Sequence, residues 1–165
     1  MPRSPVNLTG TWDGEYTYGD DYGPQRGESV PFRMSLTESG GGAVTGYVRD
    51  DAERGGMRER GRIAGKRESE ALVFLKTVPS GGDGEAEAIE PLRRFFEREL
   101  GLEMPLDLPP HRIRYAGVAS PDGAFVSGEW SIVPWRVEVE DGVIEYGAGS
   151  GTWTAKKVSP RVSAV

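Results

Sequence analysis

Leu8-Thr9-Gly10-Thr11-Trp12-Asp13-Gly14-Glu15-Tyr16-Thr17-Tyr18 is the stretch that decides how this 165-residue sequence folds. Its large rings fall on alternate positions, at Trp12, Tyr16 and Tyr18, and Gly14 shares their register. The other register is occupied by polar residues. Alternation with a period of two is typical of a β-strand with one buried and one solvated face, so we expect a strand here.

The Gly-Thr-Trp pattern of this stretch returns near the other end of the chain. Gly151-Thr152-Trp153 repeats it, and Gly128-Glu129-Trp130 is a looser copy between the two. A first and a last strand with the same pattern suggest a sheet that closes on itself. Because strand-like runs follow one another, mostly through short turns, we predict an all-β, antiparallel up-and-down β-barrel of about eight strands rather than a sandwich.

The predicted strands share alternating apolar residues and are bounded by turn residues or charged loops. They are Leu8–Tyr18, Ser29–Thr37, Ala43–Asp50, Arg60–Arg67, Glu70–Val78, His111–Ser120, Ala124–Val133 and Gly149–Lys157. Trp135–Glu140 and Val143–Gly147, which flank Asp141-Gly142, are typical of a further hairpin.

An insertion at about residues 80–110 interrupts this pattern. Within it, Pro91–Leu100 carries an apolar stripe at helical spacing, with Pro in the first turn and Gly101 just past the end, which predicts one α-helix. A helix of about ten residues is marginal in water, so we expect it to dock on the barrel. The alternative is that two chains form a homodimer through this stripe.

Length and composition bound the class of protein. The chain is most simply one domain, residues 1–165. The absence of Cys excludes disulfides and thiolate metal sites. A net charge of −6 disfavours nucleic acid and anionic membranes as partners, and no run approaches the ~20 apolar residues of a membrane span. No signal peptide pattern follows Met1, so we expect a cytoplasmic protein.

The sequence contains no complete catalytic or metal-binding constellation. His111 is the only histidine, which excludes a zinc site built on paired histidines. Asp50, Asp51 and Glu53 lack the spacing of a calcium loop and are expected to form a solvated acidic turn. We therefore assign no catalytic residue, metal or cofactor to this chain.

The chain resembles the calycin superfamily, which includes lipocalins, fatty-acid-binding proteins and avidins. Gly10-Thr11-Trp12 in the first strand and Gly151-Thr152-Trp153 in the last carry the resemblance, which covers most of Leu8–Lys157 outside the insertion. It implies a single lipocalin-like barrel that binds a small hydrophobic or amphipathic molecule in its lumen.

Two departures limit what the resemblance implies. Avidins place Asn two residues and Ser six residues after the first Trp to bind biotin, whereas this chain has Gly14 and Tyr18 there. Lipocalins pair the same Trp with a late Arg, whereas this chain has only Lys156 and Lys157 near its end. Biotin binding is therefore not implied.

The candidate ligand-binding residues form an apolar wall with a few hydroxyl groups, as small-molecule pockets usually do. They are Tyr16, Tyr18, Phe32, Met34, Tyr115 and Trp130. Glycines at inward positions would leave a modest cavity near the open end, unless large neighbours fill the space. Those glycines are Gly14, Gly46, Gly65, Gly117, Gly128 and Gly151.

Two other functions stay open. The spacing of Tyr16 and Tyr18 resembles that of phenolic acid decarboxylases, which are cofactor-free enzymes on a lipocalin-type barrel and also need an inward Arg and Glu. Arg33 and Glu15 are near in sequence but fall in the outward register. An inward acid or Arg beside Tyr16 would favour such a lyase or isomerase. The third function is a protein-interaction module with a filled core.

The alternation within each strand also predicts which side chains are buried. The expected buried set is Trp12, Phe32, Met34, Val44, Val48, Ile63, Val126, Trp130 and Trp153, and the expected exposed set is Arg33, Thr45, Arg112, Arg114 and Thr152. Leu72-Val73-Phe74-Leu75 is apolar in both registers, so we expect its outer face to be covered. Sequence alone leaves open whether Lys76 faces the lumen, where it could meet an anionic ligand, or the solvent.

Overall fold

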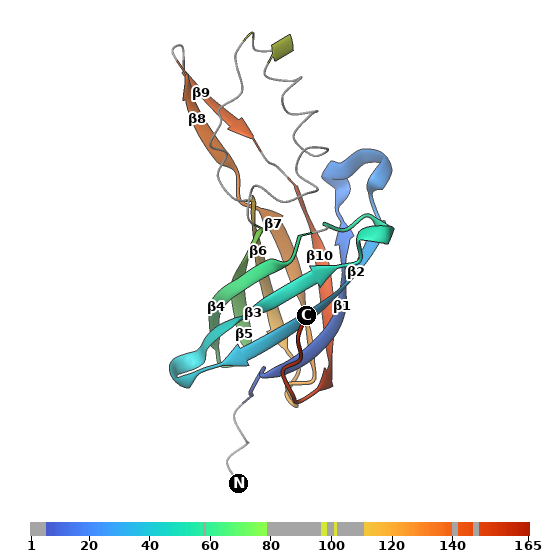
Figure 1. The fold of residues 1–165 in the computed structure, drawn as a ribbon, viewed down its shortest axis with the longest axis vertical. Coiled ribbons are helices and arrows are strands. Elements are labelled where there is room, and N and C mark those ends of the chain that lie inside the picture. The colour runs from blue at the N-terminus through green and yellow to red at the C-terminus, as the bar shows by residue number, and fades with distance from the viewer. Residues whose placement is uncertain are drawn as a thin grey trace.

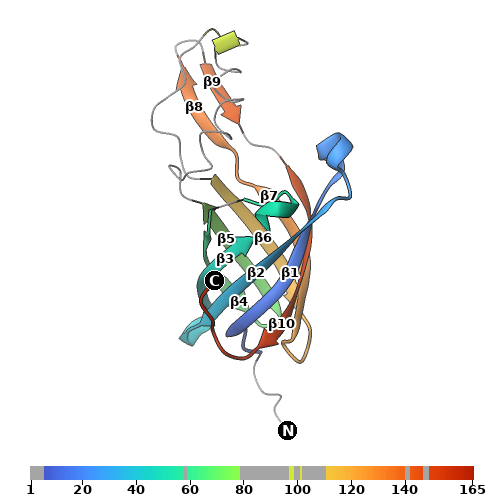
Figure 2. The same cartoon turned by 45° about the vertical axis from the view of Figure 1, so that its right-hand side comes forward.

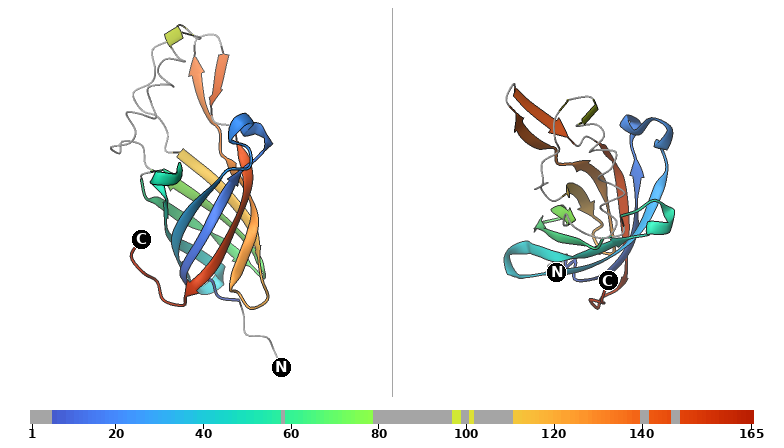
Figure 3. Two further views of the ribbon diagram at one scale, coloured as in Figure 1. Left: turned by 90° about the vertical axis from the view of Figure 1, so that its right-hand side faces the viewer. Right: turned by 45° about the horizontal axis from the view of Figure 1, so that its top comes forward.

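The computed structural model describes residues 6–57, 59–78, 97–98, 101, 111–139, 142–146 and 149–165. Eight strands form one closed antiparallel barrel in the order β1-β10-β7-β6-β5-β4-β3-β2 (Figure 1). The first and last strands of the chain, β1 and β10, lie side by side (Figure 3). The predicted all-β barrel is therefore confirmed, and its closure joins the two strands that share the Gly-Thr-Trp pattern.

The strand bounds lie close to the predicted ones. The barrel strands are β1 (Gly10–Tyr18), β2 (Ser29–Glu38), β3 (Ala43–Asp50), β4 (Gly61–Glu68), β5 (Ala71–Val78), β6 (His111–Ala119), β7 (Phe125–Ile132) and β10 (Ser150–Ser159). The predicted further hairpin, β8 (Trp135–Val139) and β9 (Gly142–Tyr146), pairs as a separate two-stranded sheet. It stands beyond one end of the barrel (Figure 2). Short 3₁₀ turns are η1 (Asp20–Gln25), η2 (Gly40–Gly42) and η3 (Ala52–Arg54).

The predicted helix Pro91–Leu100 lies outside the described residues, except for Glu97 and Arg98, which are helical. Its docking on the barrel and its alternative role in a homodimer stay predictions for the same reason. Among the residues that are described, no helix is long and apolar enough to cross a membrane.

The predicted register is confirmed on every strand where it was stated. All nine residues of the expected buried set are buried, and all five of the expected exposed set are exposed. The structure also decides the register of β5: Leu72, Phe74 and Lys76 are buried, whereas Val73 and Leu75 are 40% and 37% exposed. The expected cover over the outer face of β5 is therefore absent from the described part of the chain.

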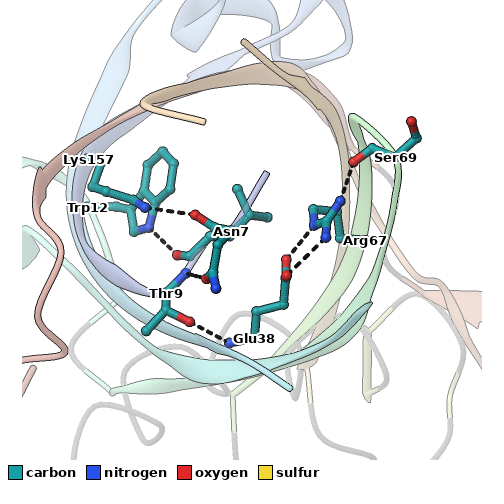
Figure 4. A network of polar contacts seen from close by, with 8 residues as sticks. Asn7, Thr9, Trp12, Glu38, Arg67, Ser69 and Lys157 are labelled. Carbon is teal, nitrogen blue, oxygen red and sulfur yellow. Dashed lines mark hydrogen bonds and ion pairs between the residues drawn. The ribbon is translucent and has the colours of Figure 1, made fainter. Parts of the chain in front are cut away.

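One end of the barrel is closed by the segment that leads into β1 (Figure 4). Leu8 is fully buried there, and its carbonyl accepts a hydrogen bond from Trp12 Nε1 at 2.9 Å. Lys157 donates to the carbonyl of Asn7 at 2.8 Å, and its Nζ lies 5.4 Å from the centroid of the Trp12 ring. Lys157 thus makes a cation–π contact with the first Trp of the chain.

The inward glycines do not leave the open space that we predicted from them. A Cβ on Gly14 would lie 2.6 Å from the ring of Phe32, and one on Gly151 would lie 2.7 Å from Trp130 Nε1. The remaining predicted sites are equally crowded, Gly117 by the ring of Trp153, and Gly46, Gly65 and Gly128 by the backbone of a neighbouring strand. Aromatic rings from adjacent strands therefore occupy the space beside Gly14, Gly117 and Gly151, which is the alternative that the sequence left open, whereas a cavity elsewhere near the open end stays a prediction.

Gly151→Ala tests this packing directly. The added methyl would overlap the carbonyl oxygen of Thr17 and the indole of Trp130, and backbone atoms cannot move aside as a flexible side chain can. Overpacking should lower the free energy of unfolding by about 1–3 kcal/mol, measured by urea denaturation. The control is Gly40→Ala, whose methyl meets nothing within 4 Å and should change stability by less than about 0.5 kcal/mol. Equal effects of the two changes would contradict the packing argument.

Candidate functional site

A buried ion pair crosses the interior near the other end of the barrel. Lys76 Nζ lies 2.8 Å from each carboxylate oxygen of Asp50, and both side chains are 1% exposed. The prediction that Asp50 belongs to a solvated acidic turn is therefore wrong. Asp50 is the last residue of β3 and keeps the inward register of Val44 and Val48, which carries its carboxylate into the lumen.

Gly61 makes the contact between Lys76 and Asp50 sterically feasible. Lys76 is on β5 and Asp50 is on β3, and β4 lies between these two strands. A Cβ on Gly61 would lie 2.9 Å from Lys76 Cγ and 3.0 Å from Lys76 Cε. The aliphatic stem of the lysine therefore passes over a glycine of the intervening strand, and a larger residue there would occupy its path.

The carboxylate of Asp50 has two further donors. Tyr16 Oη donates to Asp50 Oδ2 at 3.3 Å, and the backbone N–H of Met57 donates to the same oxygen at 3.3 Å. Gly56 lets the loop after β3 fold back over the carboxylate, because a Cβ there would overlap Asp50 Cβ and lie 3.0 Å from Val30 Cγ1. Hydrogen bonds from three groups thus offset part of the cost of burying the charge.

Aromatic rings surround Tyr16 and extend toward the rim where β1 ends. The ring centroid of Tyr16 lies 5.8 Å from those of both Tyr18 and Trp130. Tyr22 of η1 joins them, at 4.6 Å from Tyr18 and 5.8 Å from Trp130. Trp130 is fixed in place by a hydrogen bond from its Nε1 to the carbonyl of Thr17 at 3.2 Å. Tyr18 and Tyr22 are only partly buried, so they form the outer layer of the cluster.

The other predicted ligand-binding residues take different places. Phe32 stacks on Tyr16, with a centroid distance of 6.5 Å. Tyr115 is paired with Trp130 across the strands but packs its ring on Phe74 at 4.9 Å, deeper in the barrel. Met34 is buried opposite Trp12, toward the closed end, and so lies apart from the tyrosines.

Sequence reasoning missed Tyr22, misplaced Asp50 in a solvated turn and left the direction of Lys76 open. On its own strand, each of Asp50 and Lys76 lies an even number of residues from the buried side chains. This spacing places both residues inside the barrel once the inward register of the strand is known. Tyr22 lies in the 3₁₀ turn after β1, where no period relates position to burial. By contrast, the outward register of Arg33 and Glu15 is confirmed: Glu15 is exposed, and Arg33 forms a surface ion pair with Asp13 at 2.7 Å.

Burial decides the protonation of the phenols. It raises the pKa of Tyr16 well above the ordinary value, and the negative charge of Asp50 raises it further. Burial and the same charge also raise the pKa of Tyr115. Burial lowers the pKa of Lys76, against the opposing effect of Asp50. Both phenols therefore stay protonated, and Tyr16 acts as a hydrogen-bond donor to Asp50 rather than as a base.

These residues give the site a defined chemical character. The ion pair is neutral as a whole, lies in a low-dielectric interior and is bordered by neutral phenols, so it forms a polar floor beneath an aromatic rim. No group of three or more His, Cys, Asp or Glu residues in the described part of the chain could hold a metal ion. The arrangement can therefore offer stacking surfaces, hydrogen-bond donors and one buried amine.

The buried pair should respond to mutation differently from a surface pair of the same length. Lys76→Met leaves Asp50 buried without its countercharge and should lower the free energy of unfolding by about 3–5 kcal/mol. Adding Asp50→Leu should recover much of that loss, because the second change removes the uncompensated charge. Arg33→Met breaks the exposed pair with Asp13 and should cost about 0–1 kcal/mol in the same urea denaturation. A double variant no more stable than Lys76→Met would contradict this account.

The raised pKa values predict a loss of stability in alkali. Above about pH 10 tyrosines of the unfolded chain ionise, whereas Tyr115 stays protonated in the folded barrel. The folded state then binds more protons, so the free energy of unfolding falls as pH rises. Tyr115→Phe should make this fall shallower, by up to about 1.4 kcal/mol per pH unit, in urea denaturation at pH 9 and pH 11. The control is Phe74→Leu, which removes no titratable group and should lower the free energy of unfolding equally at pH 9 and pH 11. If the free energy of unfolding of Tyr115→Phe falls with pH as steeply as that of the wild type, the prediction is refuted.

No protein-family model matches this sequence, and no curated protein matches it in sequence. Solved structures include distant matches to the fold. Apo shwanavidin matches over 94% of this chain and 100% of its own, with 11% identity and a TM-score of 0.44. A mutant of transferrin-binding protein B from Haemophilus parasuis Hp5 matches over 94% of this chain and 28% of its own, with 12% identity and a TM-score of 0.35. The fold of this chain, a closed antiparallel barrel of eight strands, is evident from its own strand order.

Proposed function

We propose that this barrel binds a small amphipathic molecule with a flat apolar body at the end opposite the closed one. The observation that carries the proposal is the aromatic rim of Tyr18, Tyr22 and Trp130 above the ion pair of Asp50 and Lys76. The rim rings lie within 4.6–6.1 Å of one another, and two of them are partly exposed. A flat ligand can stack on such rings and replace the solvent over them.

The floor of the site favours a ligand with one polar end and little net charge. Asp50 already neutralises Lys76, so the site has no strong preference for either sign of charge. The hydroxyl of Tyr16 is kept protonated and lies directly beneath the rim. Its proton is donated to Asp50, so its oxygen is left to accept a hydrogen bond from a hydroxyl group on the ligand.

A cofactor-free lyase or isomerase is a second candidate, because Asp50 is the inward acid beside Tyr16 that such an enzyme requires. The acid would come from β3 rather than from Glu15, and Lys76 would stand where an Arg is needed. Loss of absorbance from a hydroxycinnamic acid, as its carboxylate leaves as carbon dioxide, tests this candidate. Turnover that persists in Tyr16→Phe would exclude the mechanism.

Ligand binding is tested with a panel of fatty acids, phenolic acids and tetrapyrroles, each beside its neutral methyl ester, and is monitored by quenching of tryptophan fluorescence. Tyr18→Ala removes a rim ring, so it should weaken binding of the best ligand by about tenfold or more, which is about 1.4 kcal/mol. Tyr47→Ala is the matched control, because Tyr47 is 38% exposed and lies on the outer face of β3, beneath the guanidinium of Arg60. It should leave the affinity unchanged.

Two outcomes of this screen would contradict the proposal. One is equal weakening by the two tyrosine changes, which would place the ligand outside the rim. The other is the absence of quenching by any ligand at millimolar concentration, which would favour an interaction module with a filled core.

A further inference from the structure

The noncovalent function proposed above uses Lys76 only as the countercharge of Asp50, although Lys76 is also a primary amine shielded from water. Its side chain is 1% exposed, whereas Lys66 and Lys156 are exposed on the outside of the barrel. A lysine in a dry, apolar environment is the kind that forms imines with carbonyl compounds, because exclusion of water protects the product from hydrolysis.

We propose that Lys76 is a covalent site, which condenses with the aldehyde group of an apolar or aromatic ligand to form a protonated imine. This inference rests on the proposed function, since the same aromatic rim would admit the body of the ligand. It goes further in naming both the ligand class, an aldehyde, and the atom that the ligand reaches, Lys76 Nζ.

The ion pair supplies both the base and the acid that condensation requires. Asp50, at 2.8 Å, takes a proton from the Lys76 ammonium, a transfer that leaves the pair neutral overall. The free amine adds to the aldehyde carbon, and the amine proton moves to the aldehyde oxygen to give a carbinolamine. The carboxyl proton of Asp50 then moves to that hydroxyl group, the carbon–oxygen bond breaks and water leaves. The product is an iminium ion beside the Asp50 carboxylate.

The charge before and after the reaction is the same, which matters in a low-dielectric interior. An ammonium paired with a carboxylate becomes an iminium paired with the same carboxylate, so no unpaired charge is buried. Tyr16 holds the carboxylate from a second direction at 3.3 Å, and its ring centroid lies 5.7 Å from Lys76 Nζ. Both contacts are suited to a cation at this position, whether ammonium or iminium.

The position of the pair also limits how far a ligand must enter. Asp50 is the last residue of β3, and Lys76 lies two residues before Val78, the last residue of β5. The amine is therefore within one inward layer of the ends of these strands. Buried Val78 forms that layer on β5, and the partly buried Tyr18 lies 5.8 Å from Tyr16 and 4.6 Å from Tyr22, as ring centroid distances.

The test uses the full chain, naphthaldehyde as the probe and cyanoborohydride to reduce any imine, followed by peptide mass spectrometry. We expect a single adduct on Lys76 and its loss in Lys76→Arg, which can keep a cation opposite Asp50. Lys66→Arg, a change on the exposed face of β4, should leave the adduct intact. Adducts confined to exposed lysines in the wild-type protein would overturn the inference, and this outcome requires no variant to fold.

A second measurement tests the role of Asp50. Without reductant, the wild-type adduct should absorb at the longer wavelength of a protonated imine, and Asp50→Asn should shift it to the shorter wavelength of the neutral form. No shift would overturn the role of Asp50 as counterion. Naphthalenemethanol, which cannot form an imine, separates the two proposals. If it binds at the rim while the aldehyde leaves Lys76 unmodified, only the covalent inference fails, and if neither binds, both fail.

Discussion

The narrow interior of a closed eight-stranded barrel is the constraint on which the rest of this structure depends. Large inward side chains cannot all point to the axis, so several of them lie flat across a glycine of an adjacent strand. Phe32 covers Gly14, and Trp130 passes Gly151 to reach the carbonyl of Thr17. The glycines therefore serve close packing rather than open space, and their cost in backbone entropy is offset by the burial of whole rings.

The ion pair of Asp50 and Lys76 is packed in the same way, with a long side chain lying across a glycine of the adjacent strand. Lys76 crosses Gly61 just as the rings cross their glycines, and the loop through Gly56 covers the carboxylate from the other side. A buried pair adds little stability relative to apolar packing but strongly penalises any state in which one partner is missing. The pair therefore ties β3 to β5 and fixes an amine, a carboxylate and a phenol at one place in the lumen.

The two ends of the barrel differ in chemistry as a result. At one end Leu8 and Trp12 are buried, and Lys157 joins the segment before β1 to the barrel. At the other, partly exposed tyrosines lie above a neutral polar floor. Both proposals depend on this asymmetry more than on the barrel fold itself. An apolar ligand can enter at the end with the tyrosines, and the amine of Lys76 lies beneath that end.

Sequence alone predicted the strands, the closure of the sheet and the register of every barrel strand except β5, because burial on one face imposes a period of two that is visible residue by residue. It also named Tyr16, Tyr18 and Trp130 among the candidate ligand-binding residues, but their contacts with one another came from the structure. Only the tertiary structure decided that Lys76 faces inward and that Asp50 meets it, since β5 is apolar in both registers and the two residues are brought together by a strand that lies between them. The contact joins residues that are far apart in the sequence, and it forms because the Lys76 side chain lies across Gly61 of the strand between them. A local sequence pattern does not show which glycine a long side chain will cross.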